Sequence, residues 1–279
     1  MVSGTSLSEY LICERITANK FLGQTREIGF GGERVFGGQI LGQATRAAQQ
    51  TVPEDRRVHS LHGYFLRIGD SSKPINYSVD ASRDGRTFST REVSAVQDGK
   101  KIFSMSTSFH IDQDGLEYRP KVTLPLDILE RINGRCPRVD GSFQSDILDI
   151  YVLNQHERTE ANAYQMWVKT RDLVSAEEGV HRAMMAYLSD IGMLMSMALP
   201  HEPELGPMTP STLTNYFVAS LDHSMWFHRE VRVDDWMFFD CRVETTGAGR
   251  GLSFARVYDR QGALIANVSQ EGILRKRVV

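Results

Sequence analysis

The sequence has few cysteines, no long apolar run and almost no excess of charge of either sign. Its three cysteines, Cys13, Cys136 and Cys241, lie too far apart for a disulfide framework or a Cys-x-x-Cys metal site, and this spacing indicates buried or inert thiols in a reducing compartment. No stretch reaches the roughly 18 uninterrupted apolar residues of a membrane span, and no secretion signal is visible. We therefore expect a cytoplasmic protein with no membrane partner.

The charge balance argues against a nucleic-acid partner. Lys and Arg number 32 against 35 Asp and Glu, so the formal net charge is -3, and binding along a phosphate backbone calls for a basic surface. With 41% hydrophobic and 24% charged residues in 279 positions, the chain has the composition of a globular protein of one or two domains.

Several catalytic motifs are also missing. None of the eight histidines stands in a His-Glu-x-x-His or Cys/His ligand pattern, so no metal is expected. Gly-x-Ser-x-Gly is absent, and the glycine-rich spots lack the spacing of a phosphate-binding loop or a dinucleotide site. Nucleotide hydrolysis and hydride transfer are therefore disfavoured, and no cofactor is expected.

Apolar residues at helical spacing predict two long helices. The first covers residues 36–51, and its many glycines and alanines make it a helix that can lie close against another backbone. The second begins after Glu178 and runs through His181, Leu188 and Leu194 to Pro200.

Each helix is followed by a series of predicted strands with turn signals between them. In the first half the strands cover residues 58–67, 75–82, 88–97 and 101–110, and in the second half residues 216–229, 236–244, 252–259 and 264–274.

The two halves also repeat in sequence. The segment Tyr64-Phe65-Leu66-Arg67 returns as Trp226-Phe227-His228-Arg229, 162 positions later, and turn glycines recur at the same offset or one more. We predict an α+β chain of two copies, each a long helix packed on an antiparallel sheet, with the two sheets pairing into one. The first copy covers residues 1–111, a Pro- and Gly-rich linker covers 112–141, and the second copy covers 142–279.

Polar residues that occur in only one copy are candidates for chemistry. Asp190 falls inside the second helix among apolar neighbours, and a carboxylate there is costly unless it is partnered or used. Ser220 and Gln270 occupy the positions of Val58 and Thr107 in the first copy. The alternative for Asp190 is the solvated helix face, and Ser and Gln are common on strands for structural reasons alone.

Histidine offers a second route to acid–base chemistry. The pair Asp222-His223 contains both groups, but adjacent residues on a strand point to opposite faces, so a structural role for His223 is favoured.

Four segments together resemble the acyl-CoA thioesterase II family of double-hotdog enzymes, over almost the whole chain. They are Val35-Phe36-Gly37-Gly38-Gln39, His62-Gly63-Tyr64-Phe65-Leu66-Arg67, Leu221-Asp222-His223-Ser224-Met225-Trp226-Phe227-His228-Arg229 and Gln270-Glu271-Gly272. The resemblance implies hydrolysis of fatty acyl-CoA to a free acid and CoA. It places the family's catalytic Asp, hydroxyl residue and Gln on Asp190, Ser220 and Gln270.

One departure concerns the hydroxyl residue, which is often Thr in this family and is Ser220 here. The hydroxyl is kept, but without the β-methyl group its rotamer is less restricted. The expected mechanism is direct attack of water on the thioester carbonyl, with Asp190 as general base or electrostatic orienter and no covalent intermediate. Ser220 and Gln270 are expected to hold the water by hydrogen bonds.

The substrate contacts are less specific. Met184 and Met193 are candidates for an apolar acyl tunnel, and Arg250 is a candidate for the CoA phosphates, although core packing and surface solvation explain such residues equally well. A homo-oligomer, dimer or tetramer, is expected from the resemblance. Two alternatives remain: a hotdog hydratase or dehydratase that uses His223 or His228, and a non-catalytic acyl-CoA binding module.

Overall fold

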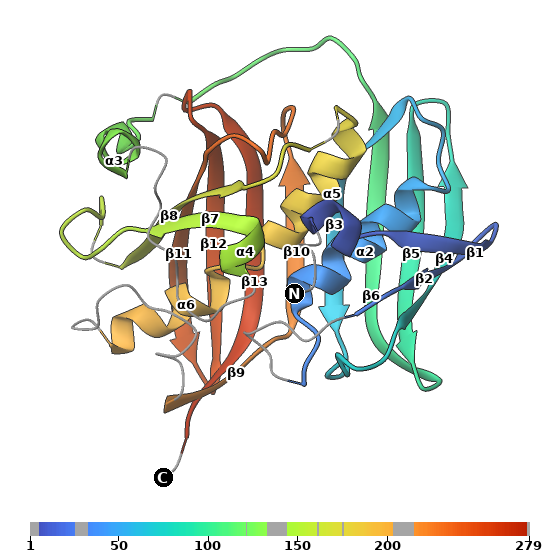
Figure 1. Cartoon of the computed structure of the whole chain (residues 1–279), viewed down its shortest axis with the longest axis horizontal. Helices are drawn as coiled ribbons and strands as arrows, with labels where there is room; N and C mark the ends of the chain where they lie inside the picture. The colour runs from blue at the N-terminus through green and yellow to red at the C-terminus, as the bar shows by residue number, and fades with distance from the viewer. Residues whose placement is uncertain are drawn as a thin grey trace.

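A computed structural model describes residues 6–25, 33–120, 122–132, 144–160, 162–174, 176–202 and 215–277. Its centre is one 13-stranded antiparallel sheet in the order β1-β2-β4-β5-β6-β3-β10-β13-β12-β11-β8-β7, with β9 paired to β13 (Figure 1). The strands are β1 Cys13–Thr17, β2 Lys20–Gly23, β3 Arg56–Phe65, β4 Ile75–Asp84, β5 Phe88–Gln97, β6 Lys100–Ile111, β7 Leu148–Val152, β8 Ala163–Thr170, β9 Tyr216–Ser220, β10 Asp222–Phe227, β11 Met237–Gly247, β12 Arg250–Asp259 and β13 Leu264–Lys276.

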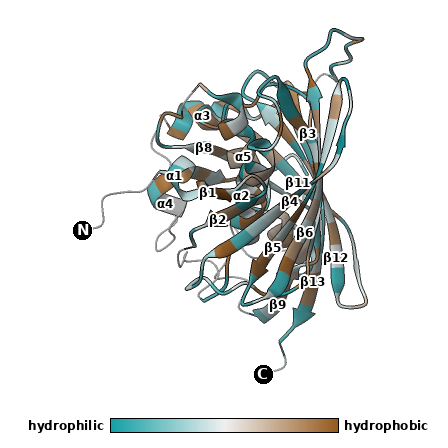
Figure 2. Ribbon diagram, turned by 90° about the vertical axis from the view of Figure 1, so that its right-hand side faces the viewer, coloured by the Kyte–Doolittle hydropathy of each residue, from teal (hydrophilic) through white to brown (hydrophobic). Residues whose placement is uncertain are grey.

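The helices are short apart from two. They are α1 Leu7–Tyr10, α2 Gly37–Gln49, α3 Leu126–Ile132, α4 Gln144–Ile147, α5 Glu178–Leu188, α6 Met193–Ala198 and a 3₁₀ turn at Leu199–His201. Helices α2 and α5 lie on one side of the central strands, and the opposite side carries no helix in the described part of the chain (Figure 2). Each half is therefore a helix on an antiparallel sheet, and the prediction of a double hotdog with one continuous sheet is confirmed.

The two halves meet at β3 and β10, and the pairing there reveals a pseudo-twofold axis. His62 pairs with Ser224, which is its repeat mate 162 positions later, and Tyr64 pairs with Asp222. A self-complementary contact between two copies produces this reciprocal register: Tyr64 pairs with Asp222, and their repeat mates Trp226 and Ser60 pair with each other. The same strand order then runs outward from this seam in both halves.

Glycines let the two long helices touch backbone to backbone. A Cβ added at Gly38 would lie 2.3 Å from the Tyr187 carbonyl oxygen, and one added at Gly42 would lie 3.1 Å from that of Ala183. The predicted close approach of the first helix is thus confirmed, and its neighbour is the long helix of the other half. Neither helix has a side-chain cap at its amino end, so packing rather than capping stabilises them.

The prediction of one continuous helix to Pro200 is wrong. Helix α5 ends at Leu188, and α6 begins at Met193 after a turn in which Gly192 has φ of 90°. That left-handed conformation favours glycine and interrupts helical hydrogen bonding. Asp190 consequently lies in the turn between two helices, not inside a helix as the apolar spacing predicts.

The predicted strand over residues 216–229 is also divided, into β9 and β10. The linker predicted at residues 112–141 contains helix α3, and residues 133–143, including Cys136, lie outside the described ranges. Strands β1, β2, β7 and β8 were not predicted. The copy boundaries at residues 111 and 142 remain predictions.

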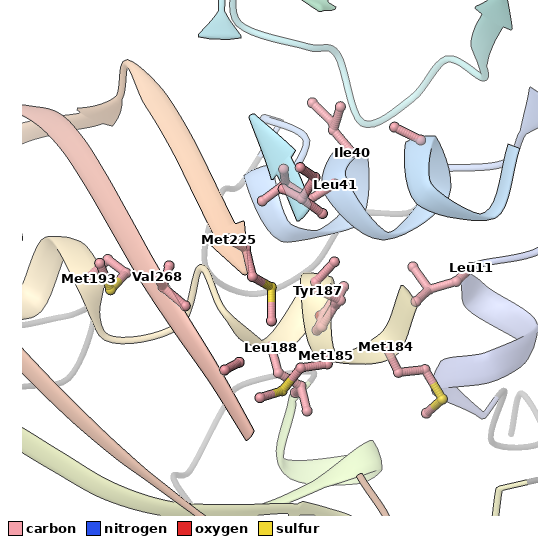
Figure 3. Close-up of a cluster of buried hydrophobic side chains, with 14 of the residues drawn as sticks. Leu11, Ile40, Leu41, Met184, Met185, Tyr187, Leu188, Met193, Met225 and Val268 are labelled. Carbon is pink, nitrogen blue, oxygen red and sulfur yellow. The ribbon is translucent and has the colours of Figure 1, made fainter. Parts of the chain in front are cut away.

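The core lies between the helices and the sheet. Leu41, Met185, Leu188 and Met225 are completely buried there (Figure 3), and each such side chain stabilises the fold by about 1.5–3 kcal/mol. The segment Glu178–His201 is apolar enough by composition to cross a membrane, but 72% of its apolar 18-residue window is buried inside the fold, as expected of core helices. Burial raises the pKa of the Cys13 thiol to about 12, and Cys241 is buried as well, so both are unreactive.

Candidate active site

The turn after α5 carries Asp190 to the amino terminus of α2, which belongs to the other half of the chain. Gly38 N–H donates a hydrogen bond to Asp190 Oδ2 at 3.0 Å. The amino end of a helix carries a partial positive charge, so this contact favours the ionised carboxylate. The candidate site is therefore built at the junction of the two halves.

Asp190 is only 8% exposed, and burial raises the pKa of its carboxyl group. Four weaker effects act in the opposite direction: the electrostatic interaction with the His223 ring and hydrogen bonds from Gln270, Gly38 and Ser220. A carboxylate that is both buried and supplied with donors is a stronger base than one in water and still has partners that stabilise its charge.

The other two predicted residues reach this carboxylate from strands. Ser220 Oγ lies 3.5 Å from Asp190 Oδ1, and Gln270 Nε2 donates to Ser220 Oγ at 2.9 Å. Gln270 is completely buried on the inner face of β13, and Ser220 is the last residue of β9. The structure thus brings Asp190, Ser220 and Gln270 together, as the asymmetry between the halves predicts. Thr107, the counterpart of Gln270 in the first half, instead donates to the Ser60 carbonyl oxygen.

A change of register beside Leu221 shapes the site. Ser220 pairs with Gly272 on β13, whereas Ser224 pairs with Ser269, so β9 and β10 contain one more residue than the strand they oppose. In a regular strand, residues 220 and 223 would point to opposite faces. The extra residue acts as a β-bulge, and both Ser220 and His223 reach Gln270.

His223, for which the sequence favours a structural role, lies in the site. It is completely buried; its Nδ1 lies 2.5 Å from Gln270 Oε1, and its Nε2 lies 2.8 Å from Ser189 Oγ. Burial lowers the pKa of the imidazole, despite the opposing effect of the Asp190 charge. The strand periodicity of the sequence indicates that His223 points inward, because it lies on the same face of β10 as the buried Met225 and Phe227.

Asp222 lies on the opposite face of β10, where its Oδ1 accepts from the backbone N–H of Glu271. The Asp222-His223 pair therefore does not act together, in agreement with the strand argument. Exposed His228 bonds to Asn267 through Nε2, and thus neither ring is directly hydrogen-bonded to the Asp190 carboxylate.

The three substrate candidates are spread more widely. Met184 and Met193 are buried at opposite ends of the apolar cluster, Met184 beside Leu11 and Met193 beside Val268 (Figure 3). Arg250 Nε donates to Glu271 Oε1 at 2.9 Å, next to Gln270 in sequence but on the other face of β13. None of the three contacts Asp190 among the interactions of the described chain. That part of the chain also contains no group of three His, Cys, Asp or Glu side chains placed to hold a metal ion.

Two family models match the chain. The acyl-CoA thioesterase N-terminal domain matches residues 26–110, and the acyl-CoA thioesterase C-terminal domain matches residues 125–274.

Individual relatives agree with these models. The chain is 37% identical to acyl-coenzyme A thioesterase 8 of Mus musculus, over 87% of this chain and 81% of the relative. It is 32% identical to acyl-CoA thioesterase 2 of Haemophilus influenzae, over 97% of both. Among solved structures, an acyl-CoA thioesterase II of Mycobacterium marinum superposes with a TM-score of 0.81 at 33% identity, over 98% of this chain and 99% of that one. These similarities extend over both halves and the junction between them, and the chain belongs to the acyl-CoA thioesterase II family.

Proposed function

We propose that the junction site hydrolyses fatty acyl-CoA to a free fatty acid and CoA, with water as the attacking nucleophile. The observation that carries the proposal is the buried carboxylate of Asp190, held by Gly38 N–H on one oxygen and facing the Ser220 hydroxyl with the other. The family membership supports a thioester as substrate.

In the proposed step, Asp190 Oδ1 removes a proton from water while the water oxygen attacks the thioester carbonyl carbon. Each carboxylate oxygen can accept two hydrogen bonds, so Oδ1 accepts from the Ser220 hydroxyl and also from water. The tetrahedral intermediate then breaks its C–S bond, and the proton passes to the departing CoA thiolate. No oxidant, reductant or covalent enzyme intermediate is required.

The developing negative charge on the carbonyl oxygen needs hydrogen-bond donors. The amino terminus of α2 lies beside the carboxylate, and an added Cβ at Gly37 would stand 2.7 Å from Asp190 Oδ2. We propose that the N–H of Gly37, at the same helix end as that of Gly38, donates to the oxyanion. The absence of a side chain at this position lets the substrate carbonyl approach the backbone.

The hydratase alternative places a catalytic His against the acid. Both ring nitrogens of His223 are engaged by Gln270 and Ser189, and His228 is bonded to Asn267, which favours hydrolysis. The hydratase would tolerate replacement of Gln270, which the proposed hydrolase does not.

The test is release of CoA thiol from acyl-CoAs of several chain lengths by the wild type and by Asp190→Asn. Thiol release by the wild type that is nearly abolished in the variant, at unchanged acyl-CoA affinity, supports the proposal. Equal turnover in both proteins contradicts the role of Asp190. Binding of acyl-CoA without thiol release in the wild type identifies a non-catalytic binding module.

The acyl chain is proposed to lie along the apolar side chains between helices and sheet, where Met184 and Met193 occupy opposite ends. Because they lie apart, Met184→Phe and Met193→Phe distinguish two paths. The variant that shortens the preferred chain length identifies the end that receives the acyl chain. If neither changes the chain-length profile, both methionines only fill the core. Arg250→Ala tests a phosphate contact through its effect on KM.

A homo-oligomer in the cytoplasm is proposed as well. The sheet face opposite the long helices exposes Tyr64 and Trp226, on the two strands that join the halves. Exposed aromatic side chains are typical of interfaces between subunits. Light scattering of the wild type and of Trp226→Glu tests this: a dimer or tetramer that dissociates in the variant is expected, and a monomeric wild type contradicts it.

A further inference from the structure

Five side chains form one continuous line of hydrogen bonds that ends on the carboxylate. From Ser189 the line passes to His223 at 2.8 Å, to Gln270 at 2.5 Å, to Ser220 at 2.9 Å and to Asp190 at 3.5 Å. Ser189 and His223 are completely buried and lie outside the set of residues to which a chemical role has been given above.

The line has a direction that follows from the chemistry of its members. A hydroxyl has a single proton, so Ser220 can donate to Asp190 only while it accepts from Gln270 Nε2. The other end of the Gln270 amide, Oε1, can only accept, and its partner is His223 Nδ1. The ring must therefore carry its proton on Nδ1.

The remaining ring nitrogen is then an acceptor, and Ser189 Oγ lies 2.8 Å from both this nitrogen and the Ala186 carbonyl oxygen, so its single proton is shared between two acceptors. A neutral imidazole with its proton on Nδ1 satisfies both contacts, and burial, which lowers the pKa of His223, favours the neutral ring. If the Gln270 amide were flipped by 180°, each donor in the line would become an acceptor, and the Ser220 proton would point away from Asp190. The orientation of the Gln270 amide thus determines whether the Ser220 proton points toward the Asp190 carboxylate.

We propose that His223, supported by Ser189, is a positioning residue that holds the Gln270 amide with its NH₂ group toward Ser220 and so directs the Ser220 hydroxyl proton to Asp190. This inference rests on the proposed hydrolysis at Asp190. His223 touches neither water nor thioester in this scheme; it acts through Gln270.

Two amide replacements of His223 separate positioning from simple core packing. In His223→Asn the side-chain NH₂ occupies the place of Nδ1 and still donates to Gln270, whereas in His223→Gln the amide reaches the place of Nε2, toward Ser189. We expect His223→Gln to lower kcat about 10- to 100-fold, with KM changed less than about twofold, and His223→Asn to recover most of that loss.

Ser189 has a closely matched control on the next helix. Ser189 Oγ lies 2.8 Å from the Ala186 carbonyl oxygen and bonds to His223, and Ser196 Oγ lies 2.7 Å from that of Met193 and bonds to a second buried side chain, Ser253. Both serines are completely buried, but only Ser189 belongs to the line. Ser189→Ala should lower kcat more than Ser196→Ala at a similar loss of thermal stability.

The wild type provides a readout that does not depend on any variant being active. With ¹⁵N-labelled histidine, long-range proton–nitrogen spectra report which ring nitrogen carries the proton, and the His223 signals are those that disappear in His223→Asn. The neutral form with the proton on Nδ1 is expected. A proton on Nε2 overturns the proposal.

The kinetic outcomes also distinguish the positioning role of His223 from the proposed hydrolysis on which it rests. Equal kcat in His223→Asn and His223→Gln, whether both high or both low, overturns the positioning role while an inactive Asp190→Asn leaves the proposed hydrolysis intact. If Asp190→Asn keeps full turnover in the same assay, the proposed function fails regardless of the His223 results.

Discussion

Gly38 and Asp190 are 152 residues apart in sequence and belong to different halves of the chain, yet the Gly38 N–H donates to Asp190 Oδ2 at 3.0 Å. The amino end of one copy's helix therefore supports the carboxylate of the other copy. The proposed site lies at this junction, where the second copy supplies the acid.

Gly37 and Gly38 are adjacent, and replacing each by Ala should have a different result. A Cβ at Gly37 would stand 2.7 Å from Asp190 Oδ2 and 3.0 Å from the Phe65 ring, both of which are side chains, so Gly37→Ala should lower kcat with a smaller loss of stability than Gly38→Ala. At Gly38 the obstacle is the Tyr187 backbone at 2.3 Å, and Gly38→Ala should cost about 1–3 kcal/mol of folding free energy. Thermal melts and thiol release measure the two effects.

Gly115→Ala is the control for this pair, because an added Cβ there has no neighbour within 4 Å. It should change neither the melting temperature nor the turnover. If Gly37→Ala and Gly38→Ala lowered the melting temperature and the turnover to the same extent, the proposed difference between the two glycines would be contradicted.

The pH dependence should reflect Asp190. Burial raises the pKa of its carboxyl group above the ordinary 3.8, and the base must be ionised to accept a proton from water. Turnover should therefore fall as the pH drops through this raised value, so that the acidic limb of the kcat/KM profile lies above pH 3.8. An acidic limb at or below the ordinary Asp value would argue that the carboxylate is not the base.

The same shift predicts the stability of Asp190→Asn. A folded-state pKa above the unfolded value means that ionisation of Asp190 weakens the fold at pH values above about 3.9. The Asn variant should thus melt at the same or a higher temperature than the wild type at neutral pH, and the difference should vanish as the pH falls below the unfolded pKa. Calorimetry at several pH values tests this, and a much lower melting temperature at neutral pH would contradict it.

Ser220 takes the place of the Thr that is common in the family. Ser220→Thr should keep or modestly increase kcat, because the added methyl group restricts the hydroxyl to fewer rotamers. Ser220→Ala removes the only hydroxyl between Gln270 and Asp190 and should lower kcat about 10- to 100-fold. Steady-state kinetics on both variants suffice, and a Thr variant as slow as the Ala variant would contradict the assigned role.

Gln270→Glu changes the amide to a carboxylate of nearly the same shape. Glu still accepts from His223 Nδ1 but cannot donate to Ser220, and its negative charge close to Asp190 should raise the pKa of the base further. We expect a lower kcat and an acidic limb displaced to higher pH. Unchanged kinetics of thiol release would contradict the role assigned to Gln270.

The duplication was readable from the sequence because turn glycines and an aromatic-Phe-x-Arg segment survive in both halves. Strand β8 was missed because it is buried on both faces, with six consecutive buried residues from Ala163, and so lacks the alternation of a half-exposed strand. The asymmetry between copies identified the residues at positions 190, 220 and 270, since polar groups at buried positions need a partner.

Other features of the site depend on backbone geometry that spacing does not encode. The helix break at Gly192 lies among apolar residues that continue the helical pattern, and the bulge beside Leu221 changes the register by a single residue. The sequence pattern therefore predicts one continuous element at each place. Yet the break aims Asp190 at α2, and the bulge brings His223 and Ser220 to the same amide.

The most direct test of the central claim is a single turnover of acyl-CoA in H₂¹⁸O. Direct attack by water places one ¹⁸O in the released fatty acid and leaves the peptide that contains Asp190 unlabelled. Attack by the carboxylate itself would form an anhydride, and hydrolysis of that anhydride at the Asp190 carboxyl carbon would place ¹⁸O in the Asp190 peptide and leave the first-turnover acid unlabelled. Mass spectrometry of the acid and the digested protein distinguishes these results: a labelled acid with an unlabelled peptide is predicted, and the reverse pattern contradicts the mechanism.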